Sequence, residues 1–344
     1  MPVRAWAQAR LEDGAFAGPL AGRASALWRR VADPVRPLAL PSGVRVVGIG
    51  GATLGGAGKT PLVLELARRL AARGERVAVV AAAYRARPGR ARQVSVDDRV
   101  DRVGDEGLML ARALAPIGVP VAVAPERQEA LELAAGLAPL VLVDALLQAR
   151  PRRLALSLLV VDASQPWGAG RCPPSGDLRA DRARLLAASD GVVLVGSAGN
   201  AVRVAVERLC RRAGRLLFEV PAGLRGARTP EGTLLGMEEL SRRRLGLALA
   251  VARPERIIAA LRASGIAPAP TCLHADHGVP APGGAGPAPE AWLATAKCAT
   301  KLDGEGSGAP VWVLEQALEP PRELLSLVAG GKADVRGLCP EKPW

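Results

Sequence analysis

Apolar residues along the first half of the chain occur alternately in short continuous runs and in segments with helical spacing. The continuous runs predict buried strands at 44–49, 77–80, 118–124 and 140–143. The helically spaced segments predict helices near 62–70, 106–115 and 126–137. This strand–helix alternation is typical of a mostly parallel sheet with helices on both faces.

A second series of apolar runs follows at wider spacing and predicts the strands 158–161, 191–195, 216–220 and 247–251. The Arg-rich segment 149–155 separates the two series, so we expect a linker at 150–157. The predicted organisation is a first domain at 1–149 that includes an N-terminal helix, a smaller Rossmann-like α/β domain at 158–325, and a C-terminal tail at 326–344.

Composition narrows the class of protein. Hydrophobic residues make up 49% of the chain and charged residues 23%, which is ordinary for a globular protein. No apolar run reaches the roughly 18 residues that a transmembrane helix needs. Glycine and proline interrupt the N-terminal segment, so we expect no cleaved signal peptide. The five cysteines contain no C-x-x-C pair, which favours free thiols in a reducing cytosol.

The chain is strongly basic, with a net charge of +13. Such a charge favours an anionic partner such as a nucleotide or a phospholipid surface, although an Arg-rich composition also arises from coding bias. Only 3% of the residues are aromatic and no nucleic-acid-binding module is visible, so we expect no nucleic-acid partner.

A glycine-rich segment between the first strand and the first helix carries the strongest chemical signal. Its candidate nucleotide-binding residues are Thr53, Gly55, Gly56, Ala57, Gly58, Lys59 and Thr60. Glycines let successive backbone N–H groups face a phosphate at the positive end of a helix. Lys59 would reach the β- and γ-phosphates, and Thr60 would bind Mg²⁺. Thr53 stands where the common motif has glycine, so the segment is a variant phosphate-binding loop (P-loop). The expected fold is therefore a P-loop NTPase-like parallel sheet domain plus the smaller α/β domain.

A P-loop also needs a carboxylate at the end of a neighbouring strand to hold the metal. Asp144 and Asp162 each follow a predicted strand, and periodicity does not choose between them. A strand-end aspartate that only caps a turn is the alternative for either residue.

The motifs around this loop resemble those of the tetraacyldisaccharide 4′-kinase family over about residues 46–313. The P-loop run 50–61 follows the family pattern, including the non-glycine at 53. The other matching segments are Gly104-Asp105-Glu106, Pro125-Glu126-Arg127, the stretch from Gly168 to Arg179, Arg253-Pro254-Glu255-Arg256, Asp276-His277, and the residues Thr295, Lys297, Ala299, Lys301 and Leu302.

The resemblance implies ATP-dependent phosphorylation of the 4′-hydroxyl of an acylated disaccharide lipid A precursor at the cytoplasmic face of the inner membrane. It implies Mg²⁺ as the metal, Asp105 as general base assisted by His277, and Thr60 and Asp144 on the metal side. The implied substrate contacts are Tyr84, Arg127, Gln148 and Arg171.

Some positions depart from the family pattern. Ala82 replaces an arginine, Ala145 replaces the second of two carboxylates, and Ala149 replaces a histidine. Two alternatives to an active kinase follow: a catalytically eroded homologue that binds nucleotide or acylated saccharide without turnover, and another deviant P-loop ATPase. Leu54 stands where such ATPases usually carry lysine.

Three further interpretations remain open from the residues alone. For Asp105, the alternative to a general base is an N-terminal cap of the helix predicted at 106–115. Cys272, His274, Asp276 and His277 could form a metal site, although their spacing matches no standard signature. Near the N-terminus, apolar and Arg residues on a helix at 20–31 suit either an anionic membrane surface or packing against the domain.

Overall fold

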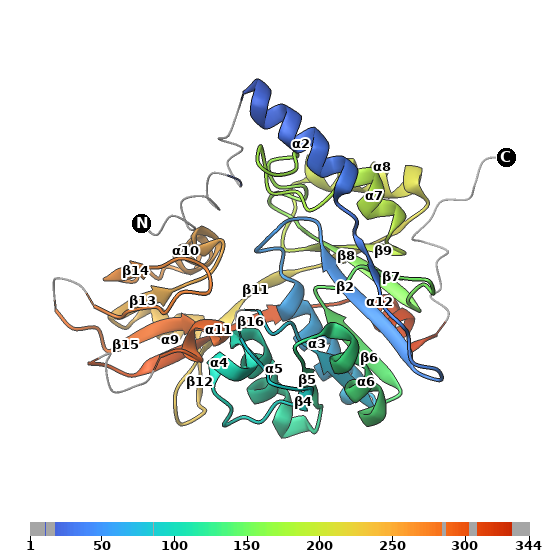
Figure 1. The fold of residues 1–344 in the computed structure, drawn as a ribbon. Helices are drawn as coiled ribbons and strands as arrows, with labels where there is room; N and C mark the ends of the chain where they lie inside the picture. The colour runs from blue at the N-terminus through green and yellow to red at the C-terminus, as the bar shows by residue number, and fades with distance from the viewer. Residues whose placement is uncertain (1–10, 12–17, 85, 284–286, 303–307, 332–344) are drawn as a thin grey trace. The chain divides into compact units, whose positions relative to one another are not determined.

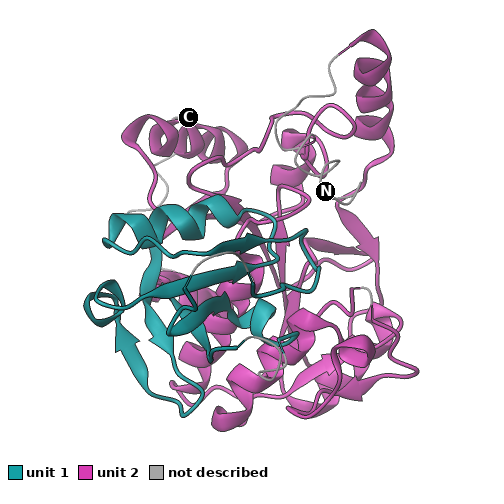
Figure 2. Ribbon diagram, turned by 90° about the vertical axis from the view of Figure 1, so that its left-hand side faces the viewer, with its two compact units in different colours: residues 1–7, 222–317 teal, residues 8–221, 318–344 magenta. Residues whose placement is uncertain are grey.

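The structure is a computed structural model that describes residues 11, 18–84, 86–283, 287–302 and 308–331 (Figure 1). The chain divides into two compact units (Figure 2). The larger unit holds the described residues up to Pro221 and those from Leu318 onward, and the smaller unit holds those from Ala222 to Ala317. Each unit contains its own sheet.

The larger unit is built on a mostly parallel sheet. Its strands, within the described residues, run in the order β10-β9-β8-β2-β6-β3-β5-β4, and β4 alone is antiparallel to its neighbour. These strands are β2 (Arg45–Gly51), β3 (Val77–Val80), β4 (Arg92–Gln93), β5 (Val121–Val123), β6 (Leu140–Asp144), β8 (Leu156–Asp162), β9 (Gly191–Val195) and β10 (Leu216–Val220). The short strands β1 (Val35–Pro37) and β7 (Gln148–Arg150) form a separate parallel pair.

The described helices of the larger unit are α2 (Pro19–Val31), α3 (Lys59–Ala71), α4 (Val100–Val103), α5 (Asp105–Leu114) with a 3₁₀ turn at Ala115–Ile117, α6 (Arg127–Leu137), α7 (Arg182–Ala187), α8 (Asn200–Ala213) and α12 (Arg322–Ala329). Helices α3, α5 and α6 bury apolar residues against this sheet, whereas Ser25 is the one buried residue of α2. In α3, Leu62, Leu66 and Leu70 are fully buried at the spacing expected for one helix face. Helix α6 packs with alternate residues of β3 and β6, such as Val80 and Val141.

The C-terminal part of the chain returns to the larger unit through α12. Leu324, Leu325 and Val328 of this helix are buried, and α12 contacts α3. Arg45 at the start of β2 donates hydrogen bonds to the carbonyl oxygens of Leu327 (2.8 Å) and Val328 (2.9 Å). The predicted tail at 326–344 is therefore wrong for residues 326–329, which belong to a packed helix; residues 332–344 lie outside the described part.

The smaller unit is a mixed α/β layer. Its sheet, within the described residues, has the order β12-β11-β16-β15-β13-β14. The run from β16 to β14 is parallel and β12 is antiparallel to β11. The elements are β11 (Ala222–Arg228), β12 (Leu234–Gly236), α9 (Met237–Ser241), β13 (Leu245–Leu249), α10 (Pro254–Ala263), β14 (Thr271–Leu273), β15 (Ala291–Thr295), α11 (Ala296–Ala299) and β16 (Val311–Leu318).

The expected division at 150–157 is wrong. Strands β8, β9 and β10 join the sheet of the larger unit, so the smaller unit begins at Ala222 instead of residue 158. The Arg-rich segment resembles a linker in composition, but it is a pinned crossover between β7 and β8. The N–H of Leu154 donates to Gln148 Oε1 (2.7 Å), and the N–H of Ala155 donates to the carbonyl of Val46 (3.1 Å).

The predicted fold class is confirmed in both units: a P-loop-type parallel sheet flanked by helices, and a smaller α/β unit. Among the described residues, no helix combines the length and the apolar character needed to cross a bilayer.

Candidate functional site

The glycine-rich segment joins the buried end of β2 to the first turn of α3. Gly56 and Gly58 both have positive φ angles (68° and 83°), a region that glycine adopts without steric cost. Gly58 is followed directly by Lys59, the first residue of α3, and no acidic residue stands in the first turn of that helix. The N-terminus of α3 therefore keeps its positive end available to an anion.

Lys59 lies back along the end of β2. A Cβ atom added to Gly51 would stand 3.0 Å from Lys59 Cδ and 3.1 Å from Lys59 Nζ. A larger residue at Gly51 would require the flexible Lys59 side chain to shift by a few tenths of an ångström. The strand end and the P-loop lysine are thus fitted to each other.

The P-loop hydroxyl and a strand-end carboxylate are directly bonded. Thr60 Oγ1 donates a hydrogen bond of 2.7 Å to Asp144 Oδ2. Asp144 ends β6, which pairs with β2, and it is 1% exposed. Its other oxygen accepts the N–H of Ala145 at 2.7 Å, and Ala145 has a positive φ of 56°. The sequence did not choose between Asp144 and Asp162 as the carboxylate on the metal side. The hydrogen bond from Thr60 associates Asp144 with the P-loop.

Asp162 lies on the other side of β2, at the end of β8. Its Oδ1 accepts hydrogen bonds from both the N–H and the hydroxyl of Ser164, each at 2.8 Å. In this arrangement Asp162 caps a turn, which is the alternative to a metal-binding role that the sequence left open.

A second loop at 168–179, the clamp loop, is hydrogen-bonded to the first residues of the P-loop. The N–H of Leu54 donates to the carbonyl of Asp177 (2.9 Å), the N–H of Arg179 donates to the carbonyl of Ala52 (2.8 Å), and Arg179 Nε donates to the carbonyl of Thr53 (3.0 Å). Arg179 therefore holds the P-loop through both its backbone and its side chain.

The clamp loop is itself tightly closed. The N–H of Ala169 donates to Asp177 Oδ1 (2.9 Å), and a Cβ at Gly168 would stand 1.9 Å from that oxygen. Helix α2 is tied to the same loop, because Ser25 Oγ donates to the carbonyl of Cys172 (2.8 Å) and Trp28 Nε1 donates to that of Arg179 (3.1 Å).

Arginines surround Asp144 with positive charge. Burial lowers the pKa of Arg127, the first residue of α6, and the Asp144 carboxylate acts in the opposite direction. Burial also lowers the pKa of Arg179, and the positive charge of Arg36 lowers it further. Guanidinium groups stay protonated despite such shifts. The site therefore combines fixed cations with one carboxylate, a pattern suited to an anion with a bound metal. Arg36 was not identified from the sequence.

The remaining substrate candidates differ in their surroundings. Tyr84 is 53% exposed, and Arg171 is exposed on the clamp loop. Gln148 is buried, so the prediction that it contacts substrate is wrong. Its Nε2 donates to Ser157 Oγ (2.8 Å), and its Oε1 accepts the N–H groups of Ala149 and Leu154. An amide with its oxygen and nitrogen occupied inside the protein is not available to a substrate.

Asp105 is the first residue of α5 and is 3% exposed. Its Oδ1 accepts the N–H of the next residue, Glu106, at 2.9 Å. The preceding Gly104 occupies the cap position, so Asp105 stands within the helix's first turn. Its carboxylate therefore lies at the positive end of the α5 helix dipole.

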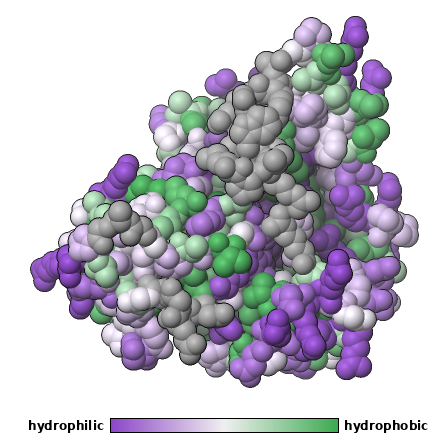
Figure 3. All heavy atoms as spheres, turned by 60° about the vertical axis from the view of Figure 1, so that its left-hand side comes forward, coloured by the Kyte–Doolittle hydropathy of each residue, from purple (hydrophilic) through white to green (hydrophobic). Residues whose placement is uncertain are grey.

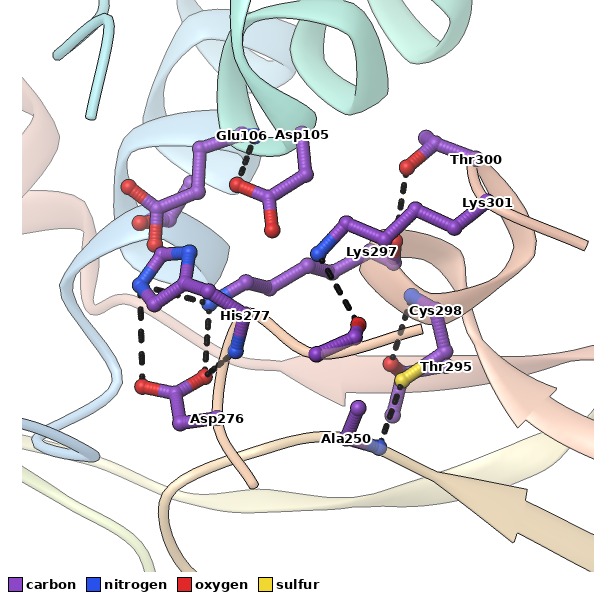
Figure 4. Close-up of polar contacts among 12 residues, drawn as sticks. Asp105, Glu106, Ala250, Asp276, His277, Thr295, Lys297, Cys298, Thr300 and Lys301 are labelled. Atoms are coloured by element: carbon purple, nitrogen blue, oxygen red, sulfur yellow. Dashed lines mark hydrogen bonds and ion pairs between the residues drawn. The ribbon is translucent and has the colours of Figure 1, made fainter. Parts of the chain in front are cut away.

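His277 lies in a tight turn of the smaller unit. The N–H of Gly278 donates to the carbonyl of Ala275 (2.8 Å), and His277 adopts a positive φ of 59°. Figure 4 shows Lys297, from α11, reaching both the Asp276 carboxylate and the His277 ring. A non-glycine residue with this φ costs about 1–2 kcal/mol and marks a position that the surrounding contacts over-determine.

The metal interpretation of the 272–277 segment is not supported. Within the described residues, no three His, Cys, Asp or Glu side chains stand close enough to hold a metal ion. His274 Nε2 accepts the N–H of Ala281 at 3.1 Å, and Cys272 Sγ lies 2.9 Å from the carbonyl oxygen of Gly283.

Comparison with known proteins gives a consistent result. A model of the tetraacyldisaccharide-1-P 4′-kinase family (LpxK) matches residues 19–330. Tetraacyldisaccharide 4′-kinases from Acidithiobacillus ferrooxidans and Anaeromyxobacter dehalogenans are each 33% identical, over 76% and 87% of this chain and 75% and 77% of theirs. The matches to the enzymes of Legionella pneumophila and Pseudomonas paraeruginosa span about half of each relative, 49% and 50%.

A solved structure shares the fold. The crystal structure described as the "apo" form of LpxK from Aquifex aeolicus in complex with ATP superposes with a TM-score of 0.67, at 20% identity, over 89% of this chain and 96% of the other. Together with the family match across the P-loop, the clamp loop and both units, the comparisons establish that the chain belongs to the tetraacyldisaccharide-1-P 4′-kinase family.

Proposed function

We propose that this chain transfers the γ-phosphate of ATP to the 4′-hydroxyl of a tetraacyldisaccharide 1-phosphate. The observation that carries the proposal is the bonded pair of Thr60 and Asp144 beside Lys59, in a chain of this family. The loop backbone, the N-terminus of α3 and Lys59 would hold the triphosphate.

The residues fit a magnesium ion. Mg²⁺ takes oxygen ligands and is usually held by one or two protein oxygens plus phosphates. The Thr60 hydroxyl and the Asp144 carboxylate supply two such oxygens 2.7 Å apart. When bound, the ion would neutralise charge on the phosphates. Arg127 and Arg179 would supply further positive charge from the protein.

On the acceptor side, the proposed general base is Asp105, which would take the proton of the sugar hydroxyl. His277 is proposed to assist it, as the family resemblance implies. Tyr84 and Arg171 are proposed contacts to the acylated saccharide, in keeping with their exposure. A planar guanidinium suits a phosphate such as the one at position 1 of the acceptor.

Helix α2 is proposed to rest on an anionic membrane, at the cytoplasmic face of the inner membrane. Its apolar residues Leu20, Leu27 and Val31 are 79%, 62% and 67% exposed, a degree unusual for leucine and valine on a packed helix. Figure 3 shows green apolar surface among purple polar surface toward the top of the view, where α2 lies. Arg30 in the last turn suits anionic headgroups, and Arg29 beside it forms an ion pair with Asp181 (2.9 Å).

The test is turnover of tetraacyldisaccharide 1-phosphate with Mg²⁺ and ATP, comparing the wild-type protein with Lys59→Ala. We expect ATP-dependent product from the wild type and a loss of at least a hundredfold in the variant. Nucleotide binding measured in parallel separates the alternative: a wild type that binds ATP but turns over no faster than Lys59→Ala would be an eroded homologue.

A further inference from the structure

A lysine, an aspartate and a histidine form a compact cluster in the smaller unit. Lys297 Nζ stands 2.9 Å from Asp276 Oδ1 and 3.2 Å from His277 Nε2. The side chains are 14%, 15% and 15% exposed, so bulk water has little access to them. The three groups therefore set one another's hydrogen bonding.

Helix α11 holds Lys297 in this place. Thr295 Oγ1 caps the helix by accepting the N–H of Cys298 (3.2 Å), and Thr300 Oγ1 donates to the carbonyl of Lys297 (2.7 Å). A second lysine, Lys301, donates to the carbonyl of Gly278 at 3.3 Å. Two lysines of one short segment thus fasten the turn that carries His277 (Figure 4).

The contacts in this cluster indicate which nitrogen of the His277 ring carries the proton. An ammonium group can only donate, so a contact of 3.2 Å from Lys297 Nζ requires Nε2 to accept. Asp276 Oδ2 lies 3.6 Å from Nε2, beyond a good hydrogen bond, and Oδ1 of the same carboxylate instead accepts from Lys297 and from the N–H of His277. The neutral ring then carries its proton on Nδ1.

We propose that Lys297 is a positioning residue that fixes His277 as the Nδ1–H tautomer. This inference rests on the proposed function, in which His277 assists the base. With Nε2 occupied by Lys297, the ring presents Nδ1–H as a hydrogen-bond donor, the form that suits a group that supports a carboxylate. Without the lysine, Nε2 is free to protonate and donate to Asp276, and the Nδ1 donor is lost.

The chain suits a direct measurement because it contains only two histidines. Long-range ¹H–¹⁵N spectra of protein labelled at histidine report the tautomer, and a His274→Gln variant assigns the His277 signals. At a pH where the ring is neutral, we expect the Nδ1–H form in the wild type and in Lys297→Arg. We expect a shift to the Nε2–H form in Lys297→Met.

Lys301→Met is the matched control, because Lys301 fastens the same turn through a backbone carbonyl. It should leave the tautomer unchanged. In the turnover assay, Lys297→Met should lower kcat by about 10- to 100-fold and leave the KM for ATP unchanged, and Lys297→Arg should recover much of the loss.

An Nε2–H tautomer in the wild type, or an unchanged tautomer in a folded Lys297→Met protein, would overturn the inference. The wild-type spectrum decides the point even when Lys297→Met does not fold. Lack of kinase turnover in the wild type counts against the proposed function alone, since the tautomer is read without any activity.

Discussion

Replacing Thr60 with valine removes the hydroxyl that joins the P-loop to Asp144 while keeping the shape of the side chain. In the structure, Thr60 Oγ1 donates to Asp144 Oδ2 at 2.7 Å, and Asp144 is 1% exposed. A hydrogen bond to a charged group contributes about 1.5–3 kcal/mol, and a buried carboxylate that loses its donor has little access to replacement water. We therefore expect Thr60→Val to lower the free energy of unfolding by about 1.5–3 kcal/mol.

Thr53 provides the matched control within the same loop. Its hydroxyl donates to the neutral carbonyl of Gly55 at 2.9 Å. A hydrogen bond between neutral groups contributes about 0.5–1.5 kcal/mol, so Thr53→Val should cost less than Thr60→Val. Thr60→Ser, which retains the hydroxyl, should recover most of the loss.

Urea unfolding without nucleotide measures these free energies, and titration of Mg²⁺ in the turnover assay measures the functional effect. Thr60→Val should raise the Mg²⁺ concentration needed for half-maximal rate, and Thr53→Val should leave it near the wild-type value. Equal losses of stability and equal Mg²⁺ dependence in the two valine variants would refute a metal-side role for the bond between Thr60 and Asp144.

Three further changes test the metal site, the loop at 168–179 and the buried thiol of Cys210. Ala145→Asp supplies a second carboxylate at a positive φ (56°) that aspartate tolerates better than alanine. The variant should need a lower Mg²⁺ concentration for half-maximal rate, and an unchanged concentration would count against a metal site there. Gly168→Ala forces a Cβ to 1.9 Å from Asp177 Oδ1, so it should lower the free energy of unfolding by about 1–3 kcal/mol and raise the KM for ATP. Gly136→Ala is the control: the added Cβ has open space around it, so neither effect is expected. Burial raises the pKa of Cys210 to about 11; because the unfolded thiol ionises first, stability should fall from about pH 9 to pH 11, and a Cys210→Ala variant should show a smaller fall.

The sequence predicted the buried strands of the larger unit well. The strands at 77–80, 191–195 and 216–220 are observed with the predicted bounds. Parallel strands buried on both faces are continuous apolar runs, which makes them visible without an alignment. Strand β11 was missed, because its sequence AGLRGAR carries two glycines and two arginines and only Gly226 and Ala227 are buried.

The site was predictable where its residues are contiguous and not where they meet through strand order. Lys59 and Thr60 follow from the motif, since loop and helix start are adjacent in the chain. The choice of Asp144 over Asp162 depends on which strand end meets Thr60, which is a long-range property of the sheet. The Gln148 prediction failed for the same reason, because its partner Ser157 lies on the next strand.

The domain boundary failed because composition and packing point in different directions. An Arg-rich stretch between two apolar series is typical of a linker, yet the hydrogen bonds of Leu154 and Ala155 fix it against β7 and β2. The actual division follows the end of β10, where the sequence VPAG has little to mark it.

The activity proposed for this chain is the transfer of a phosphate to the 4′-oxygen of its acceptor. The most direct measurement is ³¹P–¹H correlation NMR of the saccharide recovered after incubation of the wild-type protein with Mg²⁺ and ATP. We expect one new phosphate signal that correlates with the 4′-proton and is absent with Lys59→Ala. ATP hydrolysis without a new saccharide phosphate, or a new phosphate at another carbon, would contradict it.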